Sequence, residues 1–274
     1  MTDASWPTIL ATMNAAPSSL LGPDEPSPFT IDHPQGSSDI FLVCDHAGRR
    51  VPSKLGDLGV PAPEYERHIA YDIGASAVAV RMADGLDATL IRQTYSRLVI
   101  DCNRDPSVPS SIPEISEVTE IPGNRDLLPE QREARRREIF APYHDAIVAA
   151  LDRRAAAGRP TALVAVHSFT PVYKEEVRPW HVAVLFNRQP RLSLILKDLL
   201  EAEGGLTVGV NEPYFVSDLT DYTIPVHAER RGLPYLELEI RQDLIANPTG
   251  QAEWAERLIR LVPWAWEQFS GQEA

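Results

Sequence analysis

Residues 162–170 read Ala-Leu-Val-Ala-Val-His-Ser-Phe-Thr, an apolar strand pattern that runs directly into a histidine, His167. Residues 41–49, Phe-Leu-Val-Cys-Asp-His-Ala-Gly-Arg, repeat this arrangement and end around His46. Buried strands of an α/β sheet end at a crevice outside their carboxyl ends, where such folds place their chemistry. Two imidazoles delivered to that edge from separate strands predict a metal site.

The distribution of apolar residues predicts a single α/β domain. Runs rich in Val, Ile and Leu predict strands at residues 39–44, 87–93, 97–102, 161–166, 180–186 and 234–240. Helical patterns occur at residues 73–85, 129–156, 189–203 and 251–269. Strands that alternate with helices indicate a mostly parallel sheet with crossover helices, and no internal repeat or linker divides the chain.

Two segments lack a regular pattern. Residues 1–37 are rich in Pro and Ser and predict an irregular lead-in before a folded domain at residues 38–274. Residues 105–128 contain several prolines and predict a long loop. Because a loop of this length in a compact domain is usually functional, we expect it to form a lid over a site.

Composition narrows the class of protein. The chain of 274 residues is 43% hydrophobic and 24% charged, which is typical of a soluble globular protein. It contains no apolar run long enough to span a membrane and no basic signal-peptide region at its N-terminus, so we expect a cytoplasmic location. The net charge of −13 argues against nucleic-acid binding, although a local group of arginines can still bind a small anion.

The two cysteines, Cys44 and Cys102, lie near predicted strand ends. We expect buried free thiols because a disulfide is improbable in a reducing compartment. The absence of a Cys-x-x-Cys spacing argues against a thiolate zinc site.

The predicted metal site needs an oxygen ligand beside its two histidines. Zinc in catalytic sites is commonly bound by two imidazoles and one carboxylate, with a fourth position open. Asp45, Asp72 and Asp101 are the aspartates near these histidines in the predicted fold. Asp72 precedes a predicted helix, so its alternative role is that of an N-cap.

Glu239 lies within the predicted strand at residues 234–240, where an unpartnered carboxylate is costly to bury. Glu237 and Arg241 lie on the same face of that strand, because side chains alternate along it. One interpretation is a Glu–Arg ion pair at a sheet edge. The other, which we favour, is a general base that acts on a water molecule beside a metal.

Arginines flank the predicted strand at residues 97–102. Arg104 follows it with Asn103, and its planar guanidinium is suited to binding a carboxylate through two hydrogen bonds. The structural alternatives are a solvated charge after the strand and a clamp on Asp101 or Asp105. Arg97 is the first residue of this strand and is a second candidate, for stabilising negative charge on a reacting oxygen.

Five blocks of sequence, in order, resemble the N-formylglutamate amidohydrolase family. They are residues 45–48 (DHAG), 71–75 (YDIGA), 95–104 (YSRLVIDCNR), 167–170 (HSFT) and 239–244 (EIRQDL). Residues 142–144 (PYH) and 211–214 (NEPY) are also similar to that family. The resemblance covers residues 40 to 270 and implies a three-layer αβα fold with a mostly parallel mixed sheet, similar to zinc carboxypeptidases.

The resemblance also implies one Zn²⁺ per chain, bound by His46 and His167. Carboxypeptidases have a zinc-binding glutamate three residues after the first histidine, where this chain has Arg49. A guanidinium cannot bind zinc, so we expect Asp72 to supply the oxygen ligand instead. If nothing replaced that glutamate, the chain would be a non-catalytic anion-binding protein.

The implied reaction is hydrolysis of N-formyl-L-glutamate to formate and L-glutamate, as in histidine degradation. Glu239 would be the catalytic base, and Arg97 or Arg49 would stabilise the oxyanion. The expected partner is thus a small anionic N-acyl amino acid, and the residues expected to bind it are Asn103, Arg104, Arg49, His144, His227 and Arg241. The alternative enzyme is a metallo-aminoacylase or carboxypeptidase-like hydrolase with another acyl or peptide substrate.

Overall fold

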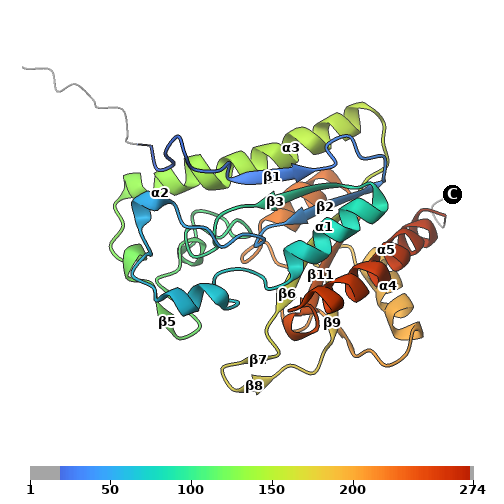
Figure 1. Cartoon of the computed structure of the whole chain (residues 1–274). Coiled ribbons are helices and arrows are strands. Elements are labelled where there is room, and N and C mark those ends of the chain that lie inside the picture. Colours follow the sequence, from blue (N-terminus) through green and yellow to red (C-terminus); the bar gives the residue numbers. More distant parts are fainter. Residues whose placement is uncertain (1–18, 272–274) are drawn as a thin grey trace, which may run out of the picture.

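The computed structural model describes residues 19–271 (Figure 1). It contains a seven-stranded sheet with the strand order β1-β3-β2-β6-β11-β9-β10. The strands are β1 (Phe29–Asp32), β2 (Ile40–Cys44), β3 (Thr89–Gln93), β6 (Ala162–Phe169), β9 (Val182–Leu185), β10 (Val208–Val210) and β11 (Tyr235–Arg241). The four central strands β3, β2, β6 and β11 are parallel, whereas β1 is antiparallel to β3 and β9 to β11. The mostly parallel mixed sheet predicted from the sequence is confirmed.

Helices cover both faces of this sheet (Figure 1). The helices α1 (Ala75–Leu86), α4 (Arg191–Ala202) and α5 (Pro248–Ser270) pack on one face, and α3 (Ala141–Ala156) on the other. Alternate strand residues enter the two cores: Leu42 packs with the first group of helices, whereas Phe41 packs with α3. Burial on both faces explains why the strands read as continuous apolar runs, and the three-layer αβα fold is confirmed.

The predicted strand at residues 97–102 is absent, and this segment forms a turn. Its apolar residues are nevertheless buried, because side chains satisfy its backbone carbonyl groups in place of a neighbouring strand. The amide of Asn124 donates to the oxygen of Leu98 at 2.8 Å, and the guanidinium of Arg135 donates to the oxygen of Val99 at 2.8 Å. The apolar run at residues 97–102 therefore corresponds to a buried turn and not to a strand.

The N-terminal segment also differs from the prediction. Within the lead-in expected to be irregular, β1 forms and pairs with the edge strand β3, while residues 1–18 lie outside the described residues. β10, which was not predicted, extends the opposite edge of the sheet beside β9. Both edge strands are short, with four and three residues, so their periodic signal in the sequence is weak.

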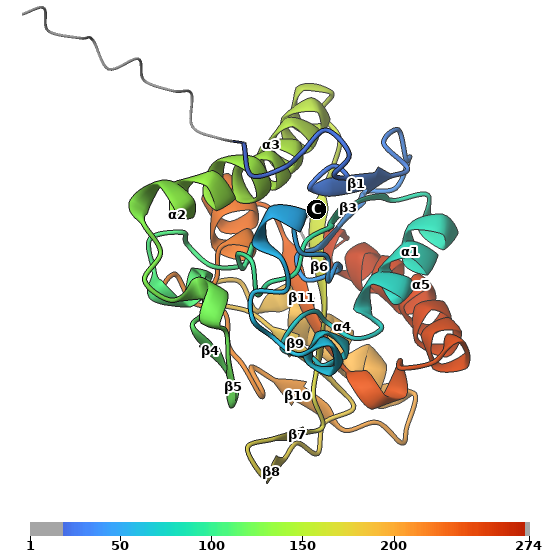
Figure 2. The same cartoon turned by 60° about the vertical axis from the view of Figure 1, so that its left-hand side comes forward.

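Two small hairpins lie beyond the carboxyl ends of the central strands (Figure 2). The predicted loop at residues 105–128 contains β4 (Ile115–Ser116) and β5 (Thr119–Glu120), and leads to α2 (Pro129–Arg135). The second hairpin, β7 (Val172–Tyr173) with β8 (Glu176–Val177), directly follows β6. A π-helical turn, Arg136–Phe140, joins α2 to α3, so the helical prediction for 129–156 holds with one local change of winding.

Two further predictions can be checked in the described part of the chain. Cys44 and Cys102 are buried and free, which confirms the expectation of buried free thiols. Among residues 19–271, no helix is long and apolar enough to cross a membrane.

Candidate metal centre

The two histidines meet because their strands are parallel neighbours. β2 pairs with β6 in parallel, with Val43 opposite Ala165, so their carboxyl ends lie at the same edge of the sheet. His46 follows β2 by two residues and His167 lies near the end of β6. Their ring centroids are 5.1 Å apart, which confirms the convergence on which the sequence argument rested.

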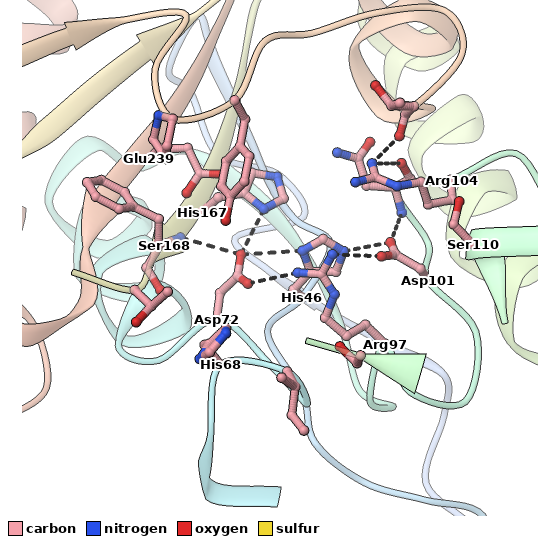
Figure 3. Close-up of a pocket in the computed structure, with 18 of the residues that line it drawn as sticks. His46, His68, Asp72, Arg97, Asp101, Arg104, Ser110, His167, Ser168 and Glu239 are labelled. Carbon is pink, nitrogen blue, oxygen red and sulfur yellow. Dashed lines mark hydrogen bonds and ion pairs between the residues drawn. The ribbon is translucent and has the colours of Figure 1, made fainter. Parts of the chain in front are cut away.

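Asp72 completes the group from the loop before α1. Its backbone N–H donates to the carbonyl oxygen of His46 at 2.9 Å, which fixes the loop beside the end of β2. Its Oδ2 lies 2.9 Å from Nδ1 of His167 and 3.4 Å from Nδ1 of His46 (Figure 3). The Asp72 side chain does not cap α1, whose N-cap is Gly74 without a side-chain hydrogen bond, so the N-cap alternative is wrong.

The chemistry of this donor set fits a metal ion. One ligand atom from each of His46, Asp72 and His167 lies within 4.8 Å of the others, and all three residues are buried. Nδ1 of His46 has no hydrogen-bond partner among the described residues. Two imidazoles and a carboxylate are the set that zinc takes in hydrolytic sites.

Asp45 and Asp101, the alternative third ligands, lie behind the histidines. Asp101 Oδ1 is 2.7 Å from Nε2 of His46, and Asp45 Oδ2 is 3.4 Å from Nε2 of His167. Asp45 also accepts hydrogen bonds from the hydroxyl groups of Tyr143 and Thr223. Carboxylates in this position orient metal-binding imidazoles, so the geometry favours Asp72 as the ligand.

Burial and neighbouring charges have opposite effects on the pKa values of Asp72 and Asp101. Burial alone would raise the pKa of Asp72, but the charge of His46 and a hydrogen bond from His167 lower it. Burial acts in the same way on Asp101, whose pKa Arg97 and His46 bring well below the usual value. Both groups are therefore ionised at neutral pH and suited to balance a cation.

Glu239 lies beside this group on β11. It is opposite His167 in the parallel pairing of β11 with β6, is only 7% exposed, and its Oε2 has no hydrogen-bond partner within residues 19–271. Burial raises the pKa of Glu239 to about 7 and that of Glu237, on the same face, to about 8. A carboxyl group with a pKa near neutrality is suited to proton transfer.

One pocket of about 520 Å³ is lined by His46, Asp72, Asp101, His167, Glu237 and Glu239 (Figure 3). Arg97 enters it beside the histidines and donates to Asp101 at 2.8 Å, with Asp72 at 3.4 Å. Arg104 lies on another wall, bonded to the backbone oxygen of Thr220 and 3.3 Å from Asp221. The alternative clamp on Asp101 or Asp105 is therefore wrong in its partner, because Arg104 pairs with Asp221, which is distant in sequence.

Asn103 also lines the pocket, but most of its hydrogen-bonding capacity is used within the protein. Its Oδ1 accepts from the backbone N–H groups of Tyr222 and Thr223, both at 3.0 Å. Its Nδ2 lies 3.4 Å from Asp221. The side chain therefore joins the turn after residue 102 to the segment that carries Asp221.

Two arginines expected to bind substrate do not line the pocket. Arg49 forms an ion pair with Glu66 on the surface and stacks on Tyr71 at 5.2 Å. Arg241 pairs with Asp243 at 2.8 Å, because β11 ends there and its last side chain turns away from the pocket. Arg241 makes no pair with Glu239, so the alternative of a Glu–Arg ion pair is also wrong.

The expectation that His144 and His227 line the pocket is corrected as well. Their rings stack at 5.0 Å, with Nδ1 of His144 2.8 Å from Nε2 of His227, and Nε2 of His144 lies 2.9 Å from the backbone oxygen of Cys102. Burial lowers their pKa values to about 4 and about 3. This neutral pair packs behind the pocket wall.

Several pocket residues were not predicted from the sequence: Ser168 on β6, and the loop residues His68, Tyr214 and Asp221. Ser168 supports the centre directly, since its hydroxyl donates to the oxygen of Ile73 and its N–H lies 3.4 Å from Asp72. Its place after His167 was a usable signal. Asp221 had no such signal in the sequence, because no regular element precedes it closely.

Comparison with known proteins assigns the family. Residues 38–246 match the family model described as N-formylglutamate amidohydrolase. A gene product of Agrobacterium tumefaciens is 39% identical, with a TM-score of 0.88 over 92% of this chain and 99% of that chain.

A more distant solved structure shares the fold. The N-formylglutamate amidohydrolase of Ralstonia eutropha is 20% identical, with a TM-score of 0.65 over 89% of this chain and 99% of that chain. No curated protein sequence matches the chain significantly. On the family match, which covers most of its length, the chain belongs to the N-formylglutamate amidohydrolase family.

Proposed function

We propose that this protein is a zinc-dependent amidohydrolase that cleaves the N-formyl, or a short N-acyl, amide of an acidic amino acid. Its substrate would be N-formyl-L-glutamate, giving formate and L-glutamate. One observation carries the proposal: the buried group His46, Asp72 and His167 has the unpartnered carboxyl group of Glu239 beside it. Family membership supports the amide as the bond that is cleaved.

His46, Asp72 and His167 would hold one Zn²⁺ per chain, with Asp101 and Asp45 orienting the imidazoles. Zinc in such a site polarises the acyl oxygen and lowers the pKa of water.

Glu239 is the proposed proton carrier. In its ionised form it accepts the proton of the attacking water, and it then transfers that proton to the amide nitrogen as the C–N bond breaks. The water oxygen forms the new bond to the acyl carbon, so the products are a carboxylate and an amine. The place of Glu239 opposite His167 brings its carboxyl group to the same end of the pocket.

Two arginines have separate proposed roles. Arg97, held by Asp72 and Asp101, would stabilise negative charge on the acyl oxygen, as fixed donors do in sites that exclude water. Arg104 would bind the substrate carboxylate with Asn103 beside it. Because Arg104 already pairs with Asp221, the substrate carboxylate must share the guanidinium with this aspartate.

Arg49 gave the non-catalytic alternative its basis, and two observations weigh against that alternative. The residue is tied to Glu66 at the surface, and Asp72 lies where an oxygen ligand is needed. We therefore favour an enzyme over an anion-binding protein.

The test is formate release from N-formyl-L-glutamate by purified zinc-loaded protein. Glu239→Gln should lower kcat by about 10²- to 10⁴-fold, because it removes the proton carrier. The variant should still bind zinc, as measured by emission spectroscopy. Glu253→Gln, at an exposed position of α5, is the matched control and should retain full activity. Bound zinc without turnover in the wild type would reject the substrate.

A further inference from the structure

Exposed apolar side chains are unevenly distributed over the described part of the chain. Of its eleven exposed large hydrophobic residues, seven lie in three short segments, at residues 115–118, 172–177 and 214–219. They are Ile115, Val118, Val172, Val177, Tyr214, Phe215 and Leu219. Scattered exposed apolar residues need no explanation, but a concentration of them marks an interaction site or a ligand groove.

These segments belong to the entrance of the pocket described above. The first is the β4–β5 hairpin and the second is the β7–β8 hairpin, both of which lie beyond the carboxyl ends of the central strands (Figure 2). Ile115 and Phe215 line the pocket although they are 59% and 63% exposed, so they form its mouth. Tyr173 lines the same pocket from the second hairpin.

The pocket is therefore divided by polarity. Its inner end carries buried ionisable groups, including His167 and Glu239, whereas its exposed lining includes Ile115, Tyr214 and Phe215 beside the polar residues Ser110 and Thr220. A volume of about 520 Å³ is within the range of pockets that bind drug-sized molecules. N-formyl-L-glutamate has a one-carbon acyl group and a carboxylate side chain, so it offers little apolar surface to Ile115 or Phe215.

We propose that this pocket selects amides with an apolar chain next to the scissile bond, and that the chain lies against Ile115 and Phe215. The inference rests on the proposed function for the polar end, where Arg104 holds a carboxylate. The apolar chain has two possible sources, an acyl group longer than formyl or an aliphatic amino-acid side chain. Both present the same methylene groups to the mouth.

Binding to the zinc-loaded Glu239→Gln variant tests this inference without relying on turnover. One calorimetric series uses N-formyl-, N-acetyl-, N-butanoyl- and N-hexanoyl-L-glutamate, and the other uses N-formyl derivatives of alanine, norvaline and norleucine. Affinity should rise by about two- to fourfold per methylene in one series, the upper value corresponding to about 0.8 kcal/mol per buried CH₂. The series that responds identifies the source of the chain.

Variants at the mouth give the second part of the test. Ile115→Ser and Phe215→Ser, each in the Glu239→Gln background, should flatten the dependence of affinity on chain length. Leu194→Ser is the matched control, since this residue of α4 is 37% exposed and does not line the pocket, and it should leave the dependence unchanged.

The outcomes separate this inference from the proposed function. Two outcomes overturn the inference even if formate is released from N-formyl-L-glutamate. One is an affinity that does not rise with chain length in either series. The other is a rise in both serine variants that is as steep as in the parent Glu239→Gln protein. A rise that needs Ile115 and Phe215 supports it even if that substrate is not hydrolysed. A dimer that either serine variant dissociates, with the chain-length dependence unchanged, would assign these residues to contacts between copies and also overturn the inference.

Discussion

Residues that do not touch the reactants hold the candidate centre in place. Asp101 lies 2.7 Å from the outer nitrogen of His46 and also accepts from Arg97. Such carboxylates fix the orientation of the imidazole and raise its basicity. The strength of metal binding should thus depend on a residue that was considered, on sequence grounds, as a ligand itself.

Asp101→Asn should lower zinc affinity by about 10- to 100-fold, because it removes the charge behind His46 while keeping the size of the side chain. Competition with a chromophoric chelator measures this affinity. Asp105→Asn, at an exposed position whose carboxylate accepts hydrogen bonds from Ser107, is the control. Equal affinity of the Asp101 variant and the wild type would show that Asp101 has no supporting role.

The pH dependence of activity should follow Glu239. Burial raises the pKa of this group to about 7, and a general base acts only when ionised, so kcat/KM should rise as the pH rises through about 7. Below that point it should fall by about tenfold per pH unit. Initial rates between pH 5 and 9 measure the profile. Rates that stay constant between pH 5 and 9 would contradict the assignment.

The sequence predicted the centre best where a side chain lies at or just beyond the end of a buried strand. His46, His167 and Glu239 were identified in this way, because a parallel sheet brings such strand ends together. It failed for Arg49 and Arg241, since their direction depends on surface partners that lie on other segments. Loop residues such as Asp221 gave no signal, because their position is set by tertiary contacts alone.

At the scale of elements, the loop before α1 is held by close contacts. Gly74 has φ +81°, and a Cβ there would lie 2.2 Å from the backbone oxygen of Ile245. Asp72 is two residues away. The position of the oxygen ligand therefore depends on the packing of this glycine against the segment that precedes α5.

Gly74→Ala should destabilise the protein by about 1 to 3 kcal/mol, through both the left-handed backbone conformation and the displaced contact. It should also weaken zinc binding, because Asp72 moves with the loop. Gly204→Ala is the matched control, with φ +77° and no atom within 4 Å of the added Cβ, so it carries the backbone cost alone. Urea unfolding of the two variants separates the cost of the backbone conformation from the cost of the displaced contact with Ile245. Equal losses would mean that the loop yields at no cost.

Most elements were predictable, and the failures have a common cause. Long strands and helices gave clear periodic patterns, whereas the turn at residues 97–102 was taken for a strand because its apolar side chains are buried. Its carbonyl groups are satisfied by Asn124 and Arg135, a solution that no local pattern reveals. The short edge strands β1 and β10 are likewise set by their neighbours.

At the scale of the whole molecule, the centre joins three distant parts of the chain. His46, Asp72 and His167 come from β2, the loop before α1, and β6, so a bound ion crosslinks elements that separate on unfolding. Metal binding is then coupled to the stability of the fold.

Zn²⁺ at about 100 times its Kd should stabilise the native state by about 2.7 kcal/mol, raising the Tm by about 5 to 10 °C for a domain of this size. Calorimetry of chelator-treated protein, with and without zinc, measures the shift. His167→Gln should show no shift, and Mg²⁺ should not replace zinc, because it prefers oxygen ligands. An identical shift in the His167 variant would place the ion elsewhere.

The two thiols offer a native reporter of how often this centre opens. Cys44 directly precedes Asp45, Cys102 directly follows Asp101, and both are buried, with the pKa of Cys44 raised to about 12 by burial. A thiolate is the reactive form, so a labelling reagent can react only when the ends of these segments come apart. The labelling rate of the unmodified protein therefore measures how often the segments that carry Asp45 and Asp101 open. A bound ion should lower this labelling rate.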